Sequence, residues 1–310
     1  MANLHILILR SIIVSSSVLI LLSFSLVFPN LFSRKGSYNE GQYLTQILLS
    51  KEAALDIQHN TGHIPSTAYE VNIFQYCQYN LINSTYSSPN STHEKPQFYP
   101  VKSSNFLSFS KKRKNNNLSS LFSAFSNKVI DHSSYKCHWT FPSPANIFDP
   151  VDLFGVPVSE HTLPEELVLH HTRFERYSRC LPFLLVCFVL TQFYMIRANQ
   201  LKLVQLRRQD LLPVHKGGHH SKYHTPNHQS RYSGNTITVM SILSALLIVL
   251  LVMLDLARDK NLFHLISEFY TSKQAPIYVF PKSAASTNLL TWMSEISILL
   301  IPICVISKLL

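Results

Sequence analysis

The sequence predicts an all-α integral membrane protein with four transmembrane helices and a large disulfide-containing extracellular or lumenal loop in which some β-structure is expected. Apolar residues make up 46% of the 310 residues and charged residues only 14%, against about 25% in soluble domains. The charges gather between four apolar stretches. Gly is scarce, at 7 residues, and the sequence contains no G-x-G-x-x-G, Walker, H-E-x-x-H or G-x-S-x-G motif. These observations exclude a nucleotide-binding α/β enzyme and a disordered protein.

A helix needs about 20 predominantly apolar residues to cross the hydrocarbon core of a bilayer. Four stretches qualify, namely 11–33, 180–196, 232–254 and 288–307. The first could be a cleaved signal peptide, but its apolar run is long and no A-x-A site follows it, so we expect an uncleaved anchor. The last could be a lipid-anchor signal, although Lys308 and three earlier spans favour a fourth helix.

The intervals between the spans differ in charge and in glycosylation motifs, which predicts their sides. The interval 197–231 is rich in Lys and Arg and has a single acid, Asp210, so the positive-inside rule places it in the cytoplasm. All N-x-[ST] sequons of the chain fall in the interval 34–179, at Asn83, Asn90 and Asn117. The predicted layout is cytoplasmic for 1–10, 197–231 and 308–310, and extracellular or lumenal for 34–179 and 255–287.

Two of the five cysteines lie in the predicted outer segment, and the others lie within or beside spans. The latter are expected to pack as small apolar residues: Cys180, Cys187 and Cys304. The two cysteines of the outer segment are Cys77 and Cys137. In an oxidising compartment we expect them to form a disulfide rather than remain as two free thiols. That bond would close a loop of about 61 residues, worth roughly 4 kcal/mol. The alternating runs 71–74 and 135–141 predict strands beside these cysteines.

The segment that begins at Cys137 reads CHWTFPSPANIFDPVDLFGVP, and LPEELVLHHTRFERYSRCLPF then enters the second span. Together with the earlier Tyr76-Cys77 pair and the unequal spacing of the spans, this order resembles the fungal Sur-seven/PalI family of claudin-like four-span membrane proteins. The family motif of aromatic, proline and acidic residues falls on Phe148, Asp149, Pro150, Val151, Asp152 and Phe154. The G-x-W-x-x-C element of the family is replaced here by the sequence Asn72–Cys77.

The resemblance implies a non-enzymatic plasma-membrane protein that organises a membrane domain at the cell cortex, with roles in cell-wall integrity, endocytosis or secretion. The alternative is a pH-response sensor of the PalI type, or an ion-flux accessory component that uses Glu295. Small residues of the third span are expected to allow close lateral packing of helices: Ser241, Ser244 and Ala245. From the residues alone, FDPVDLF is a proline-fixed turn with capping aspartates, and it serves either as a structural linker or as a binding epitope.

Glu295 is the only acid well inside a predicted span, and an intramembrane acid is a candidate ion or proton site. We favour instead a protonated, hydrogen-bonded carboxyl or a position at the membrane interface. Lys202, Arg207 and Arg208 follow the second span and either contact anionic headgroups or form an ordinary basic flank.

Five histidines of the interval 197–231 could in principle bind zinc or copper: His215, His219, His220, His224 and His228. They lie among Gly, Pro, Ser and Asn without cysteine, so a flexible polar loop is favoured, and no metal or cofactor is expected. The expected partners are membrane lipids, other membrane proteins or a second copy of the chain, and cell-wall glycan. Nucleic acid is not expected, because the membrane layout accounts for the net charge of +10.

Overall fold

The computed structural model consists of two compact units, each assembled from separate parts of the chain. It describes residues 2–28, 43–62, 64–83, 128–141, 147–151, 153, 165–211, 228–271, 277–280 and 282–309. The first unit, here called the helical bundle, combines Met1–Phe24, Phe183–Leu254 and Leu289–Leu310. The second unit, the sheet domain, combines Ser25–Pro182 and Asp255–Asn288.

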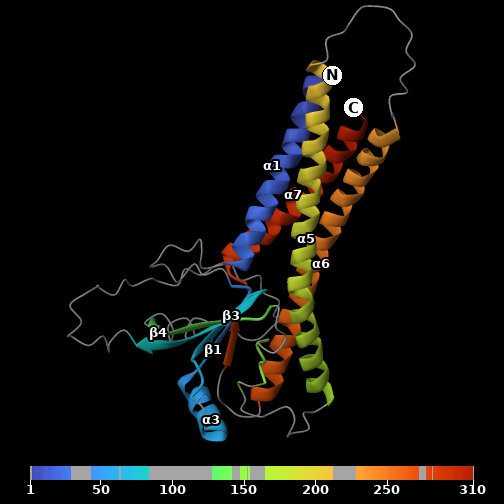
Figure 1. The fold of residues 1–310 in the computed structure, drawn as a ribbon. Helices are drawn as coiled ribbons and strands as arrows, with labels where there is room; N and C mark the ends of the chain where they lie inside the picture. Colours follow the sequence, from blue (N-terminus) through green and yellow to red (C-terminus); the bar gives the residue numbers. More distant parts are fainter. Residues whose placement is uncertain are drawn as a thin grey trace, which may run out of the picture. The chain divides into compact units, whose positions relative to one another are not determined.

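Among the residues that the structure describes, four helices are long and apolar enough to cross a membrane, in agreement with the predicted multi-pass membrane architecture. They are α1 (Ala2–Val27), α5 (Glu165–Leu211), α6 (His228–Thr271) and α7 (Ala284–Leu309) (Figure 1). The helices α5 and α6 extend well beyond the apolar stretches predicted for them, because hydropathy marks only the part of a helix that suits lipid. The helix α1 ends at Val27, earlier than the predicted stretch, since a residue that precedes proline, here Phe28, disfavours helical geometry.

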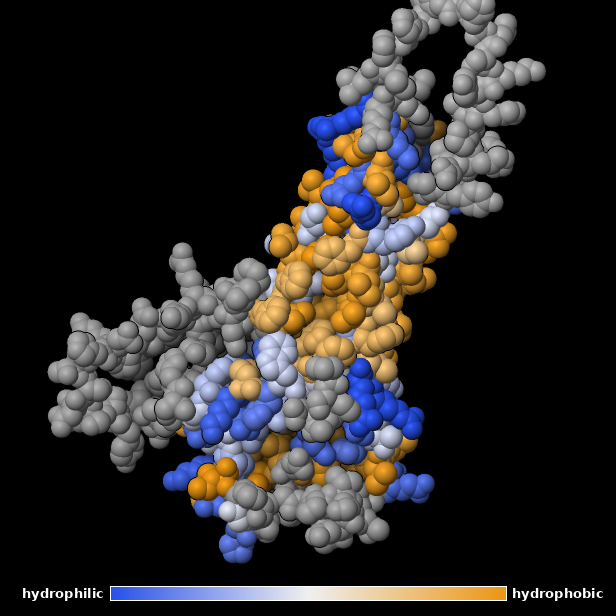
Figure 2. Space-filling model, viewed as in Figure 1, coloured by the Kyte–Doolittle hydropathy of each residue, from blue (hydrophilic) through white to orange (hydrophobic). Residues whose placement is uncertain are grey.

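The helical bundle is apolar outside and has small and polar residues inside. Figure 2 shows orange, apolar residues over its helices, and Leu190, Leu246 and Leu299 are among those exposed. Among the buried residues are Ser16, Gln192, Ser241, Ser244 and Ala245. The amide of Gln192 donates a hydrogen bond to the hydroxyl of Ser244 across 2.5 Å, between α5 and α6. The small residues of the third span therefore allow close packing of helices within this bundle. Because they are buried, they are not available for contact with other proteins in the membrane.

The sheet domain contains a five-stranded antiparallel sheet in the order β4-β3-β2-β1-β5. The strands are β1 (Thr45–Leu49), β2 (Ala68–Val71), β3 (Gln75–Asn83), β4 (Lys128–Trp139) and β5 (Ile277–Phe280). The strand predicted at 71–74 is wrong in part, because Asn72–Phe74 forms the turn between β2 and β3. The β-structure expected in the outer loop is present as this sheet, so the all-α prediction holds for the membrane helices and not for the whole chain. The sheet unites both intervals predicted to lie outside.

A short helix, α3 (Lys51–Thr61), follows β1 and has well-defined ends. The hydroxyl of Ser50 accepts a hydrogen bond from the Ala53 amide at 3.1 Å, which caps the first turn. Gly62 ends the helix in the left-handed conformation, with φ of 72°, and its amide donates to the Gln58 carbonyl.

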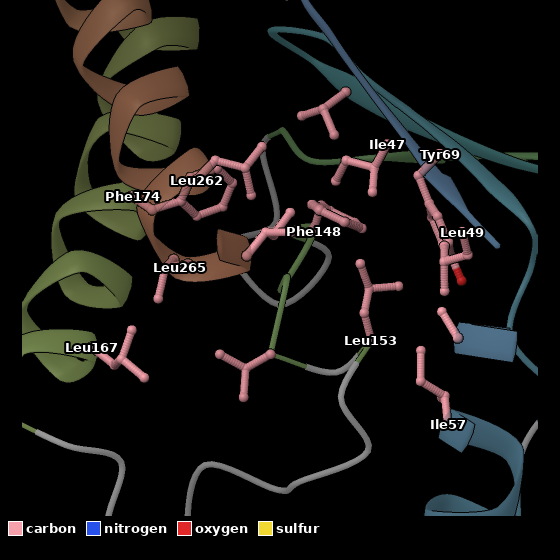
Figure 3. Close-up of a cluster of buried hydrophobic side chains, with 14 residues drawn as sticks. Ile47, Leu49, Ile57, Tyr69, Phe148, Leu153, Leu167, Phe174, Leu262 and Leu265 are labelled. Atoms are coloured by element: carbon pink, nitrogen blue, oxygen red, sulfur yellow. The ribbon is translucent and has the colours of Figure 1, made fainter. Parts of the chain in front are cut away.

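The main core of the sheet domain lies against one face of the sheet. Alternate strand residues such as Ile47, Tyr69 and Val71 point to this face, as the period of two along a strand requires. Phe174 of α5 and Leu262 of α6 approach from the helical side. Figure 3 shows Phe148 and Leu153 between the two sides, so the described residues of FDPVDLF fill the space between sheet and helices.

Candidate functional site

The described residues of the FDPVDLF motif belong to the core of the sheet domain. Phe148, Val151 and Leu153 are buried. The centroid of the Phe148 ring lies 5.6 Å from the Tyr69 ring centroid and 5.3 Å from the Tyr76 ring centroid. The Asp149 carboxylate accepts a hydrogen bond from the Val151 amide at 2.8 Å, so it caps the turn as predicted. Pro150 is buried in this turn, whereas Asp152 and Phe154 lie outside the described residues. The described part of the segment thus has a structural role.

Histidines of α5 connect this segment and α6. The Nε2 atom of His171 lies 2.9 Å from the Asp149 carboxylate, which is a charge-assisted contact when the imidazole is protonated. The adjacent His170 hydrogen-bonds Asn261 through Nδ1 at 2.7 Å and stacks on His264 with 5.0 Å between ring centroids. Within the described ranges, no group of three or more His, Cys, Asp or Glu side chains could hold a metal ion.

A buried cluster of four charged side chains joins α6 to the start of α7. It consists of Asp255, Arg258 and Asp259 of α6 together with Lys282, which follows β5. Asp255 and Arg258 are fully buried, and their Oδ1 and Nη2 atoms are 2.9 Å apart. The other Asp255 oxygen contacts the Lys282 ammonium. Two acids and two bases balance, and burial of charge is tolerable only when it is paired in this way.

The same cluster also holds the sheet through polar contacts. The Thr45 hydroxyl donates to the Asp259 carboxylate at 2.5 Å, and Arg258 donates to the Asn72 carbonyl at 3.3 Å. This charged cluster thereby ties α6 to the start of β1 and to the turn between β2 and β3. The sequence signal for it is the DLARD run at the end of the third apolar stretch, because residues three and four apart share a helix face. From the sequence, these residues are expected only to lie in the outer interval 255–287.

The opposite face of the sheet encloses another buried acid, Glu70 of β2. The Tyr79 hydroxyl donates a hydrogen bond to the Glu70 carboxyl group at 3.1 Å, and the Gln46 side-chain amide donates one to the same hydroxyl at 2.8 Å. Burial raises the pKa of Glu70 to about 7, an effect that the Tyr79 hydrogen bond only partly offsets. The pKa of Tyr79 is raised as well, by burial and by the neighbouring Glu70. Glu70 is therefore a group of the folded sheet domain whose pKa lies near neutral pH.

The predicted disulfide is confirmed. Cys77 of β3 is bonded to Cys137, its neighbour across β4. Asn83 is the last residue of β3, whereas Asn90, Asn117 and four of the five loop histidines lie outside the described residues. Glu295 is exposed on the outer surface of α7, on the same stripe as Trp292 and Leu299.

The basic residues after the second span continue α5. Lys202 is half-buried and Arg207 is exposed, and Arg208 follows in the same helix. Of the cysteines expected to pack in the spans, Cys304 is buried and Cys187 is half-buried, but Cys180 is exposed. The expectation that all three pack as small apolar residues is therefore not met by Cys180.

Comparison of the chain with protein-family models, with curated proteins and with solved structures found no match. The resemblance to the Sur-seven/PalI family therefore stays a prediction. The interpretation of the site rests on its own geometry.

Proposed function

We propose that the chain is a non-enzymatic multi-pass protein of the plasma membrane that organises a membrane domain at the cell cortex. Its sheet domain would lie outside the cytoplasm, where it would meet other membrane proteins, a second copy of the chain or cell-wall glycan. The observation that carries the proposal is the disulfide-bonded sheet joined to helices that suit a membrane. Roles in cell-wall integrity, endocytosis or secretion follow from the family resemblance.

Four independent features support the proposed sidedness. The strands β1 and β5 are paired, so the intervals 34–179 and 255–287 belong on one side of the membrane. All sequons lie in the first of these intervals. The bonded Cys77–Cys137 pair favours an oxidising compartment, and the basic interval 197–231 favours the cytoplasm for the other side.

The experiment that tests this proposal combines glycosidase digestion with imaging of a fluorescently tagged chain in living cells. We expect the chain to lose mass on digestion and to give a patchy signal at the cell rim. A variant with Gln in place of Asn83, Asn90 and Asn117 should show no mass change on digestion, whereas Asn288→Gln, which alters an exposed residue outside any sequon, should behave like the wild type. A diffuse endomembrane signal without glycan would contradict the proposal.

A second candidate function, a pH-responsive component of the membrane, is favoured by the buried Glu70 with its pKa of about 7. Glu295, the acid named from the sequence, lies on the outer surface of the bundle, so an ion site there would need a ligand from another molecule. The substitution Glu295→Gln should leave localisation and activity of a scaffold unchanged. Loss of a pH- or ion-dependent output in that variant would favour an ion-flux role for Glu295, whereas a pH response that depends on Glu70 should be lost in Glu70→Gln instead.

A further inference from the structure

Exposed aromatic rings gather at one end of the sheet domain. Trp139 ends β4 and is 44% exposed, and Phe141, two residues later, is 41% exposed. The Trp139 ring packs edge-on against Phe28, which is itself 38% exposed, with 5.7 Å between centroids. Large aromatic side chains on a surface mark an interaction site more often than single aliphatic ones do.

The rings are held in place by the sheet. Trp139 is paired with Gln75 across β3 and β4, two residues beyond the Cys77–Cys137 disulfide. The Thr140 amide then donates to the Phe74 carbonyl at 2.7 Å, and the rings of Phe74 and Phe141 meet edge-on at 5.6 Å. The end of β4 is therefore a fixed platform that presents Trp139 and Phe141 outward.

Phe28 shows what this platform faces. It follows Val27 directly, and the candidate span Leu4–Val27 ends there. The end of an apolar run marks the boundary between hydrocarbon and headgroups, where tryptophan is enriched because its ring is apolar and its N–H seeks a polar partner. Because Trp139 touches Phe28, it lies at this boundary when α1 crosses the bilayer.

We propose that Phe28, Trp139 and Phe141 form an interfacial anchor by which the sheet domain binds the headgroup layer of the bilayer. The inference rests on the proposed membrane-spanning role of α1. The anchor fixes the disulfide-bonded end of β4 against the membrane surface. A lipid surface, rather than a protein, is its partner.

The chain has 2 tryptophans, which makes a direct test possible. The variant Trp292→Phe leaves Trp139 as the single tryptophan, and it alters an outward-facing residue of α7 that is 59% exposed. The protein is reconstituted into vesicles of ordinary phosphatidylcholine, or of phosphatidylcholine brominated near the headgroup or near the chain ends. We expect Trp139 emission to fall in brominated vesicles, with a larger loss when bromine is near the headgroup.

The reciprocal variant Trp139→Phe serves as the control, because it leaves only Trp292 within the candidate span of α7. Emission from Trp292 should fall with brominated lipid in the same vesicles. If Trp292 is quenched and Trp139 is not, the anchor is overturned while the membrane-spanning role stands. If neither is quenched, the membrane-spanning proposal fails and the anchor fails with it.

Discussion

Glu70 is a carboxyl group whose protonation depends on its enclosure by the sheet. Burial raises its pKa from 4.5 to about 7, so the folded state binds its proton more tightly than the unfolded state does. The stability that comes from this difference is fully present below about pH 4.5 and is lost as the pH rises through about 7. Since one pKa unit corresponds to about 1.4 kcal/mol, the charged carboxylate costs the fold roughly 3 kcal/mol.

The substitution Glu70→Gln should remove this cost, because the amide stays neutral and can still accept the Tyr79 hydrogen bond. We expect the wild type to unfold at progressively lower temperature between about pH 4.5 and about pH 7, and the variant to change much less. Thermal unfolding of the detergent-solubilised protein measures this. Glu165→Gln, at an exposed residue of α5, should retain the wild-type slope, and an equal slope in Glu70→Gln would contradict the prediction.

Asp149 has two partners, the Val151 amide and the His171 ring, at 2.8 and 2.9 Å. Asp149→Ala removes both contacts and leaves a buried turn without its cap, which should lower the free energy of unfolding by about 1–3 kcal/mol. Asp149→Asn keeps an acceptor for the Val151 amide and should lose less. Chemical denaturation, monitored through the accessibility of the Cys77–Cys137 disulfide to reductant, distinguishes the two variants. Equal stability of both variants would rule out the capping role of Asp149.

At the scale of elements, α6 is coupled to the sheet through its buried charges. Removal of one member of a buried ion pair leaves an uncompensated charge, which typically costs about 3–5 kcal/mol. Lys282→Met should therefore destabilise the sheet domain strongly, because Asp255 and Asp259 then face Arg258 alone.

The double variant Asp255→Asn with Lys282→Met restores the charge balance, so it should be more stable than the sum of the single effects predicts. We expect a coupling energy of about 1–3 kcal/mol in the double-mutant cycle, measured by thermal unfolding. A matched cycle with Lys260, an exposed residue of the same helix, in place of Lys282 should show additivity within about 0.5 kcal/mol. Additive effects of Asp255 and Lys282 would mean that their contact carries no stability.

The elements differ in how far they could be predicted from the sequence. The membrane helices could be predicted because each depends on its own apolar composition. The disulfide could be predicted because Cys77 and Cys137 are the two cysteines of the predicted outer segment. The strand β5 has four residues, Ile277–Phe280, and its partner β1 lies far away in the chain, so no local pattern indicates the pairing. For the same reason the DLARD run predicts neighbours on one helix face, but it does not identify Lys282 or Asn72 as their partners.

At the scale of the whole molecule, the pairing of β1 with β5 constrains the membrane topology. One sheet cannot form from segments on opposite sides of a bilayer, so α5 and α6, which separate these strands in the sequence, must together return the chain to the same side. Two crossings satisfy this requirement. A single crossing by either helix alone would place β5 away from its partner.

This constraint can be tested by single-cysteine labelling in intact cells, in a background that lacks Cys180, Cys187 and Cys304. Leu55→Cys in α3 and Lys260→Cys in α6 are exposed positions of the sheet domain, and both should react with a membrane-impermeant maleimide added outside. Arg207→Cys, near the far end of α5, should react only after the cells are permeabilised. Reaction of one sheet-domain position without the other would contradict the shared sheet, whereas reaction of Arg207→Cys alone would reverse the proposed orientation and leave the two-crossing argument intact.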